Sequence, residues 1–372
     1  MKEANKYRII IGGGGTGGHI FPAISIANAI GNALGEAVEF LFVGARGKIE
    51  MEKVPEAGYE IIGLPVAGFQ RKITIKNVSF FFKLIRSMQI SGKVVRTFDP
   101  HLAIGVGGYA SGPIVKAAAR RKVPVMLQEQ NSYAGVTNRI LAKSAEKICV
   151  AYKGMERYFP MEKIILSGNP VRQDLVLPAT EREKSFRHFG LDPSRKVLLL
   201  IGGSGGARTL NESVMQHIRE ISASGAQLVW QSGKYYYEAA MELLKESGAA
   251  NIILLPFIRE MNRAFQVADV IISRAGAGTI SELCVIGKPV ILVPSPNVAE
   301  DHQTRNARSL TDEHAGILVH DRDAVKELIA KALQLLDDEQ EKTLLSKNIK
   351  MLALPDASDR IAGEAINILK RI

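Results

Sequence analysis

The fold is decided by two similar stretches, Arg8-Ile-Ile-Ile-Gly-Gly-Gly-Gly-Thr-Gly-Gly-His19 and Lys196-Val-Leu-Leu-Leu-Ile-Gly-Gly-Ser-Gly-Gly-Ala207. Each is a short apolar run typical of a buried strand, followed by a glycine-rich loop and a helical pattern. Each also opens an alternation of strands with helices, the pattern of a parallel sheet. The chain therefore predicts two Rossmann-like, doubly wound α/β domains that face each other across a ligand-binding cleft.

The remaining elements follow from apolar runs and helical periodicity. Strands are expected at roughly 8–11, 38–43, 102–106, 123–127, 147–150, 164–166, 197–201, 227–231, 252–255, 269–272, 289–293 and 316–319. Helical periodicity marks 80–96, 111–121, 134–144 and 323–336. The polar stretches 167–172 and 178–184 predict the join, giving domains 1–171 and 172–355, with a last helix over 356–372 that could pack on the first domain.

Composition places the 372-residue chain among globular proteins with a full core, because 46% of residues are hydrophobic and 23% charged. Forty-eight basic residues against 38 acidic ones leave a net charge of +10. This surplus predicts an anionic partner, which could be a nucleic acid, an acidic membrane surface or a phosphorylated ligand.

Cys149 and Cys284 both lie in apolar surroundings, with no spacing of a zinc site or a disulfide framework, so a reducing compartment is expected. The amino-terminal apolar run is too short for a signal peptide, and no run approaches the length of a membrane span.

The first glycine loop satisfies G-x-G-x-x-G at Gly13, Gly15 and Gly18, directly after a strand and at the start of a helix. Such a loop lets backbone N–H groups approach a phosphate at a positive helix N-terminus. A dinucleotide site also needs an acid at the end of the second strand, and Val38–Arg46 ends without one. A phosphate-bearing ligand is favoured over a nicotinamide or flavin cofactor, and a glycine turn that serves packing only remains an alternative.

His19 lies in the first turn of the helix that follows this loop. A positive helix N-terminus disfavours the imidazolium, so the ring stays neutral and can accept a proton. The alternative is a histidine that only caps or packs.

The second half carries a comparable loop in Ser273-Arg-Ala-Gly-Ala-Gly-Thr-Ile-Ser-Glu-Leu-Cys284. Glu282 is placed to accept hydrogen bonds from a ribose diol, although an acid early in a helix is also favoured by the helix dipole. A polar cluster, Asp301-His-Gln-Thr-Arg-Asn-Ala307, follows where a strand meets a helix.

Six motifs in order are similar to the MurG family of peptidoglycan N-acetylglucosaminyltransferases. They are Gly-Gly-Thr-Gly-Gly-His (14–19), Gly-Val-Gly-Gly-Tyr-Ala-Ser-Gly-Pro (105–113), Glu-Gln-Asn (129–131), Gly-Asn-Pro-Val-Arg (168–172), Gly-Gly-Ser-Gly-Gly-Ala (202–207) and Asp-His-Gln-Thr-x-Asn-Ala (301–307). The resemblance spans about residues 8–320. Gln128 stands where that family often has histidine.

The resemblance implies the glycosyltransferase B fold, with UDP-GlcNAc mainly on the second domain and a lipid acceptor on the first. His19 is the implied base, and Glu129 is a second candidate for the proton transfer. The implied donor-binding residues are Thr16, Gly17, Gly18, Asn131, Arg172, Ser204, Ile258, Ala277, Gly278, Thr279, Ile280, Ser281, Glu282 and Gln303. Gly107, Gly108 and Tyr109 lie on the acceptor side.

No metal or other cofactor is expected, because helix N-termini and Arg172 can stabilise the leaving diphosphate. The one Asp-x-Asp, Asp321-Arg-Asp323, is interpreted as helix N-capping and not as a metal site.

Basic and apolar residues alternate over Phe69–Arg86 in a way that suits an anionic membrane surface. The predicted membrane patch consists of Lys72, Ile75, Phe81, Phe82 and Arg86. The alternative is an ordinary helix with one core face. Aromatic residues are not interleaved with basic ones as in a nucleic-acid surface, so nucleic acid is not an expected partner.

The implied reaction is inverting transfer of GlcNAc from UDP-GlcNAc to the 4-hydroxyl of undecaprenyl-diphospho-MurNAc-pentapeptide (lipid I), at the cytoplasmic face of the plasma membrane. The alternatives are another UDP-sugar lipid glycosyltransferase or a UDP-GlcNAc epimerase of the same fold, and a nucleotide-binding module without catalysis.

Overall fold

The computed structural model describes residues 6–66, 75–172, 174–203 and 205–372, and it gives the backbone but not the side chains of residues 75–79 and 299. The chain divides into two compact units. The first unit runs up to Val171 and also contains Pro355–Ile372, whereas the second unit is the continuous stretch Arg172–Leu354.

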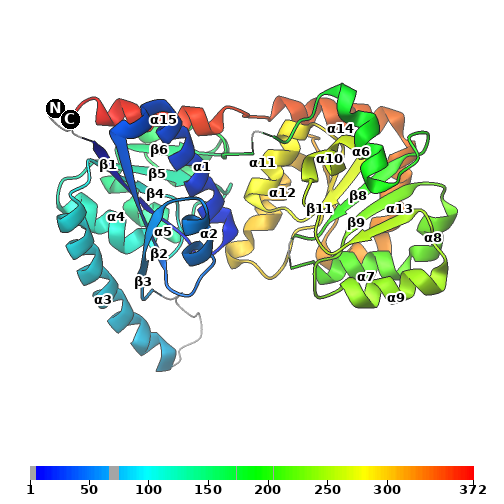
Figure 1. Cartoon of the computed structure of the whole chain (residues 1–372), viewed down its shortest axis with the longest axis horizontal. Coiled ribbons are helices and arrows are strands. Elements are labelled where there is room, and N and C mark those ends of the chain that lie inside the picture. Colours follow the sequence, from blue (N-terminus) through cyan, green and yellow to red (C-terminus); the bar gives the residue numbers. More distant parts are fainter. Residues whose placement is uncertain (1–5, 67–74, 173, 204) are drawn as a thin grey trace. The chain divides into compact units, whose positions relative to one another are not determined.

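The first unit is built on a parallel sheet of seven strands in the order β3-β2-β1-β4-β5-β6-β7 (Figure 1). The strands are β1 (Tyr7–Gly12), β2 (Val38–Ala45), β3 (Glu60–Leu64), β4 (Leu102–Gly105), β5 (Val125–Glu129), β6 (Lys147–Val150) and β7 (Ile164–Leu166). The helices are α1 (Gly17–Leu34), α2 (Glu50–Glu56), α3 (Ile75–Phe98), α4 (Ser111–Arg120), α5 (Val136–Leu141) and α15 (Ala357–Leu369).

Both faces of this sheet are covered, which is why its central strands are mostly apolar. Ile9 and Ile11 pack in one cluster with α1 and α15, whereas Ile10 packs in another with α3, α4 and α5. Helix α15 lies against α1, so a segment from the end of the chain completes the core of the first unit (Figure 1).

The second unit repeats the same topology with six parallel strands in the order β10-β9-β8-β11-β12-β13. The strands are β8 (Val197–Ile201), β9 (Gln227–Gln231), β10 (Ile252–Leu255), β11 (Val270–Ser273), β12 (Val290–Leu292) and β13 (Ile317–Leu318). The helices are α6 (Arg182–Phe189), α7 (Arg208–Gln216), α8 (Ile218–Ala223), α9 (Tyr237–Ser247), α10 (Met261–Val267), α11 (Ala277–Ile286), α12 (His302–Thr311), α13 (Asp321–Asp337) and α14 (Glu339–Met351).

The expectation of parallel α/β sheets is confirmed, and each expected strand exists with its ends moved by at most a few residues. The sequence pattern missed β3, an edge strand that pairs with β2 and is only half-buried over most of its length. Both cysteines are buried and unpaired by disulfides, as expected.

In each unit the strand order reverses next to the first strand, between β1 and β4 and between β8 and β11. Ligands of open α/β sheets bind beyond the carboxyl ends of the strands at such a switch point. One glycine loop lies at each of these two places. In the first unit the topology brings it next to the loop after β4, and in the second unit next to the loop after β11.

Candidate functional site

His19 lies in the first turn of α1, with its ring between two glycine-rich segments of the first unit. Its Nδ1 lies 3.1 Å from Thr16 Oγ1. A Cβ placed on Gly107 would lie 3.0 Å from the His19 ring, and Gly107 also has a φ of +88°, so only glycine fits there. The turn after β4 thus forms one wall of the pocket that holds the imidazole.

The Thr16 contact bears on which nitrogen of His19 can act as a base, because it engages Nδ1. When Nδ1–H donates to the threonine hydroxyl, Nε2 carries the lone pair that can accept a proton. Thr16 therefore orients the ring, and the tautomer with its proton on Nδ1 is the one that a base at Nε2 needs.

A buried carboxylate accepts hydrogen bonds from the backbone of the first glycine loop and of the end of β2. Glu50 Oε1 accepts hydrogen bonds from the N–H groups of Gly15 and Ala45, both at 2.9 Å. Glu50 is fully buried on α2. The sequence pattern does not reveal this residue, because it follows the second strand by five positions and not directly.

Glu129, the second candidate for proton transfer, is only 2% exposed. Its two oxygens accept hydrogen bonds from the backbone N–H groups of Asn131 and Gly135 and from the side-chain amides of Asn131 and Asn138. Burial raises the pKa of Glu129, and these hydrogen bonds oppose the rise. The structure thus places Glu129 as the acceptor that shapes the loop carrying Asn131.

Gln128, the departure from the family motif, is also buried, and its side-chain amide donates to Asn169 Oδ1 at 2.9 Å. Strand β5 is joined in this way to the loop after β7. Gln128 is a structural residue of the first unit.

In the second unit, Arg172 and Glu282 form an ion pair at 3.1 Å between Nε and Oε1. Burial raises the pKa of Glu282, and the neighbouring Arg172 opposes the rise. The sequence assigned the two residues to different parts of one ligand, the diphosphate and the ribose. The ion pair places the side chain assigned to the diphosphate next to the side chain assigned to the ribose.

Gln231 at the end of β9 connects two predicted ligand segments. Its Nε2 donates to the carbonyl of Gly203 in the second glycine loop at 3.0 Å, and its Oε1 accepts the Ile258 N–H at 2.9 Å. This buried amide was missed because a glutamine at a strand end has no distinctive motif. Ser204, which the sequence assigns to the diphosphate, lies outside the described residues.

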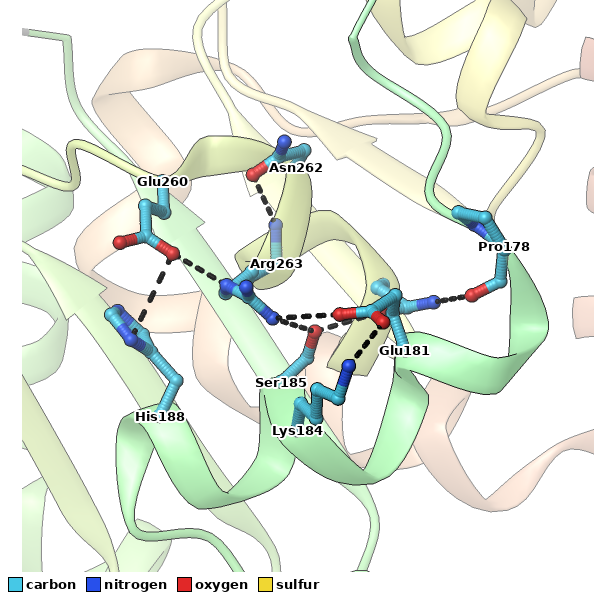
Figure 2. Close-up of polar contacts among 9 residues, drawn as sticks. Pro178, Glu181, Lys184, Ser185, His188, Glu260, Asn262 and Arg263 are labelled. Atoms are coloured by element: carbon cyan, nitrogen blue, oxygen red, sulfur yellow. Dashed lines mark hydrogen bonds and ion pairs between the residues drawn. The ribbon is translucent and has the colours of Figure 1, made fainter.

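The segment that follows Ile258 is anchored by a polar cluster between α6 and α10 (Figure 2). Arg263 lies at its centre, with Nε 2.5 Å from Glu260 Oε2 and Nη1 3.7 Å from Glu181 Oε2. Its Nη1 also donates to Ser185 Oγ at 3.5 Å. Since Glu260 directly precedes α10, these contacts fix the position from which the Ile258 backbone is presented.

The loop after β11 leads into α11, whose first residues Ala277–Glu282 were predicted to line the nucleotide. Arg274 holds this loop by donating to the carbonyls of Val293 and Pro294 and to Asp321. Gln303, predicted to bind sugar hydroxyls, accepts the Ser295 N–H at 2.9 Å through its Oε1. Its amide group lies on the first turn of α12.

The N-capping interpretation of Asp321 and Asp323 is wrong. The N-cap of α13 is His320, without a side-chain hydrogen bond, and the Asp321 carboxylate binds Arg274 and Thr209. Asp321 is therefore an internal partner of the β11 loop. Within the described ranges, no group of three or more histidine, cysteine or acidic residues could hold a metal ion.

The predicted membrane patch lies on α3 of the first unit. Phe81 and Phe82 are 59% and 70% exposed, and Arg86 is also exposed. Lys72 lies outside the described residues, and of Ile75 only the backbone is described. No helix in the described part of the chain is long and apolar enough to span a membrane.

Two Rossmann-like units with glycine loops at both switch points define a glycosyltransferase of the B fold. The models of the glycosyltransferase family 28 N-terminal and C-terminal domains match residues 9–150 and 197–361. The chain belongs to this family and, within it, to the group of its relatives named UDP-N-acetylglucosamine–N-acetylmuramyl-(pentapeptide) pyrophosphoryl-undecaprenol N-acetylglucosamine transferase.

Relatives with that name are similar over nearly the whole chain. The protein from Phocaeicola vulgatus is 54% identical, over 97% of this chain and 96% of its own. The protein from Parabacteroides distasonis is 51% identical, over 98% and 99%. The crystal structure of Acinetobacter baumannii MurG matches with a TM-score of 0.77 and 25% identity, covering 98% of this chain and all of that one.

A putative UDP-N-acetylglucosamine 2-epimerase from Listeria monocytogenes matches with a TM-score of 0.68 at 14% identity, covering 99% of this chain and 98% of that one. At that identity the likeness concerns the fold alone.

Proposed function

We propose that the protein transfers GlcNAc from UDP-GlcNAc to the 4-hydroxyl of undecaprenyl-diphospho-MurNAc-pentapeptide, with inversion to a β1,4 linkage. The bond from the acceptor oxygen to the anomeric carbon forms as the bond from that carbon to the diphosphate breaks, and UDP leaves. The names of relatives above 50% identity support this reaction. Such an enzyme serves peptidoglycan synthesis and, through it, cell shape and division.

The observation that carries the proposal is the setting of His19. Its ring is held by Thr16 and lies against Gly107 at the β1/β4 switch point. In this proposal Nε2 takes the proton of the acceptor hydroxyl, and Gly107, Gly108 and Tyr109 contact the acceptor. Glu129 acts through the shape of the Asn131 loop, since its oxygens already accept four hydrogen bonds.

The second unit is proposed to hold the donor without a metal or other cofactor. Glu282 binds the ribose, the Ile258 backbone meets the uracil, and Arg172 with the glycine loop around Ser204 meets the diphosphate. The Ile258 N–H is engaged by Gln231, so its carbonyl is the group proposed to accept from the uracil. Positive helix N-termini at α7 and α11 favour the charge that develops on departing UDP.

The remaining predicted donor contacts are kept within this proposal. From the first unit they are Thr16, Gly17, Gly18 and Asn131, and from the second unit Ala277, Gly278, Thr279, Ile280, Ser281 and Gln303. The exposed side chains Phe81, Phe82 and Arg86 of α3 are proposed to contact the anionic lipids of the cytoplasmic face of the plasma membrane.

The deciding experiment measures UDP release from UDP-GlcNAc with and without lipid I. The transferase requires both substrates, whereas an epimerase converts UDP-GlcNAc alone and a binding module consumes nothing. We expect His19→Ala to lower kcat by about a hundredfold or more, the usual contribution of a general base, with donor affinity retained.

Glu282→Ala is the matched comparison, because it is expected to raise the KM for UDP-GlcNAc while leaving the base in place. Wild-type turnover in His19→Ala would exclude this base, and an unchanged donor KM in Glu282→Ala would exclude the ribose contact.

A further inference from the structure

An apolar cavity of about 390 Å³ lies in the first unit between α3, α4 and α5. Among the described residues that line it, Lys116 is the only charged one, and most of the others are aliphatic or aromatic. Cavities of this size commonly hold small ligands, and so apolar a wall suits a hydrocarbon far better than a sugar or a nucleotide. The cavity is thus chemically unlike the rest of the proposed site.

The cavity adjoins the proposed acceptor side of the first unit. Tyr109 lines it and directly follows Gly107 and Gly108, and Gly107 lies against the His19 ring. The cavity wall and the candidate base are therefore connected by a turn of two residues.

The charged group of the cavity lies on the same side. Lys116 is one turn beyond Gly112 on α4, and helical side chains point back toward the helix N-terminus. A diphosphate at the Gly107–Gly108 turn would lie near the positive N-terminus of α4, and Lys116 adds a positive charge to the wall of the same cavity. The wall thus offers a place for an anion at one end and for hydrocarbon beyond it.

We propose that this cavity, which we call the prenyl pocket, binds the isoprenoid segment of the lipid acceptor that adjoins its diphosphate. The inference rests on the proposed function and adds to it a contact with the chain of the lipid, separate from the membrane patch. A methyl-branched, uncharged chain matches the wall, and van der Waals packing against its aliphatic and aromatic side chains would hold the chain there.

The outer wall of the prenyl pocket is open to the surroundings. Ile140 and Val136 on α5 both line the pocket, and they are 67% and 52% exposed. On α3, Leu84 lines the pocket, whereas its neighbour Ile85 is exposed and does not. Leu84 therefore provides the test variant, and Ile85 provides a control on the same turn of the helix.

The test compares two acceptors with the same sugar diphosphate, one with a long isoprenoid chain and one with a short saturated alkyl chain, in detergent micelles. For Leu84→Gln and Ile140→Gln we expect the KM for the isoprenoid acceptor to rise about tenfold, because a polar amide replaces an aliphatic side chain that packs against the isoprenoid. The KM for the short-chain acceptor, the KM for UDP-GlcNAc and kcat should stay near wild type. Ile85→Gln, outside the pocket, should keep all four values.

An equal rise for both acceptors would indicate a structural defect and overturn the prenyl pocket, as would an unchanged KM for the isoprenoid acceptor. Failure of the proposed function looks different, because the wild type would then release no UDP with either acceptor. Direct binding of an isoprenyl diphosphate needs no turnover, and it should weaken in the two pocket variants but not in Ile85→Gln. Unchanged binding in the pocket variants would overturn the inference.

Discussion

Glu50 shows how one buried side chain can fix a loop that appears to be determined by its glycines. Its Oε1 joins the N–H of Gly15 to the N–H of Ala45, so the glycine loop is tied to the end of β2. A Cβ on Gly14 would clash with the same oxygen. The carboxylate and the glycine backbone therefore occupy complementary space, and the start of α1 is set by their contact.

Glu50→Ala tests this role. The change leaves two N–H groups without their acceptor, and a buried unsatisfied donor costs about 1–3 kcal/mol. We expect a lower Tm and a kcat reduced more strongly than the donor KM is raised, because the loop leads directly into His19. Thermal unfolding and steady-state kinetics measure the two effects.

Glu52→Ala on the same helix is the control, since the Glu52 side chain is 68% exposed. It should keep the wild-type values. A Glu50→Ala protein with normal kcat would show that the carboxylate does not position the loop.

The residues that sequence could identify are those within recognisable motifs. His19 and Glu282 follow glycine loops, and the structure gives each a defined position at a switch point. Glu50, Gln231 and Arg274 were not identified because each acts on backbone groups of a distant segment. Such contacts depend on which loops the fold brings together, and no local pattern encodes them.

At the scale of elements, the strands buried on both faces were predictable and the edge was not. Runs such as Ile9–Ile11 and Leu198–Leu200 are entirely apolar because helices cover both sides of the sheet. β3 carries Glu60 and Gly63 and is half-buried, so its sequence does not stand out. The α6–α10 cluster in Figure 2 could not be predicted either, because ion pairs between two helices produce no periodic pattern in the sequence.

Lys288, between α11 and β12, gives the second unit a pH dependence. Burial lowers the pKa of Lys288 from 10.5 to about 8, although its Nζ donates to the carbonyls of Gln266 and Ala268. Between these two pH values the unfolded chain holds the proton and the folded chain does not. The free energy of unfolding should therefore rise with pH from about 8 to about 10.5.

Lys288→Met should remove this rise, as measured by urea unfolding at a series of pH values. Lys326→Met, at an exposed position on α13, is the control that should retain it. The same slope in Lys288→Met as in the wild type would contradict the assignment.

At the scale of the whole molecule, the two units differ in how the chain builds them. The second unit is one continuous stretch, whereas the first needs α15 from beyond it. Ile361, Ile368 and Leu369 of α15 are buried in the same cluster as Ile9 and Ile11 of β1. The first core is therefore incomplete without the last helix.

Ile368→Ala should destabilise the first unit by about 2–5 kcal/mol, the usual cost of such a truncation in a core. Trp230, the one tryptophan, is fully buried in the second unit, so its fluorescence follows that unit. We expect the variant to lower the Tm of an unfolding transition that is followed by circular dichroism. The Tm followed by Trp230 fluorescence should not change.

Leu345→Ala on α14, which opens a similar gap in the second core, is the matched comparison and should shift the Trp230 transition. If Ile368→Ala shifted that transition equally, the two units would unfold as one.

The return of α15 also sets an order of events during synthesis. All residues of the second unit leave the ribosome before Ala357, so its sheet can close while translation is still under way. β1 and α1 are made first, and the apolar surface that α15 covers stays open until residues Ala357–Leu369 have also emerged. The first unit therefore starts to form first and is completed last. During synthesis, the apolar surface of its amino-terminal part needs protection by chaperones for the longest time.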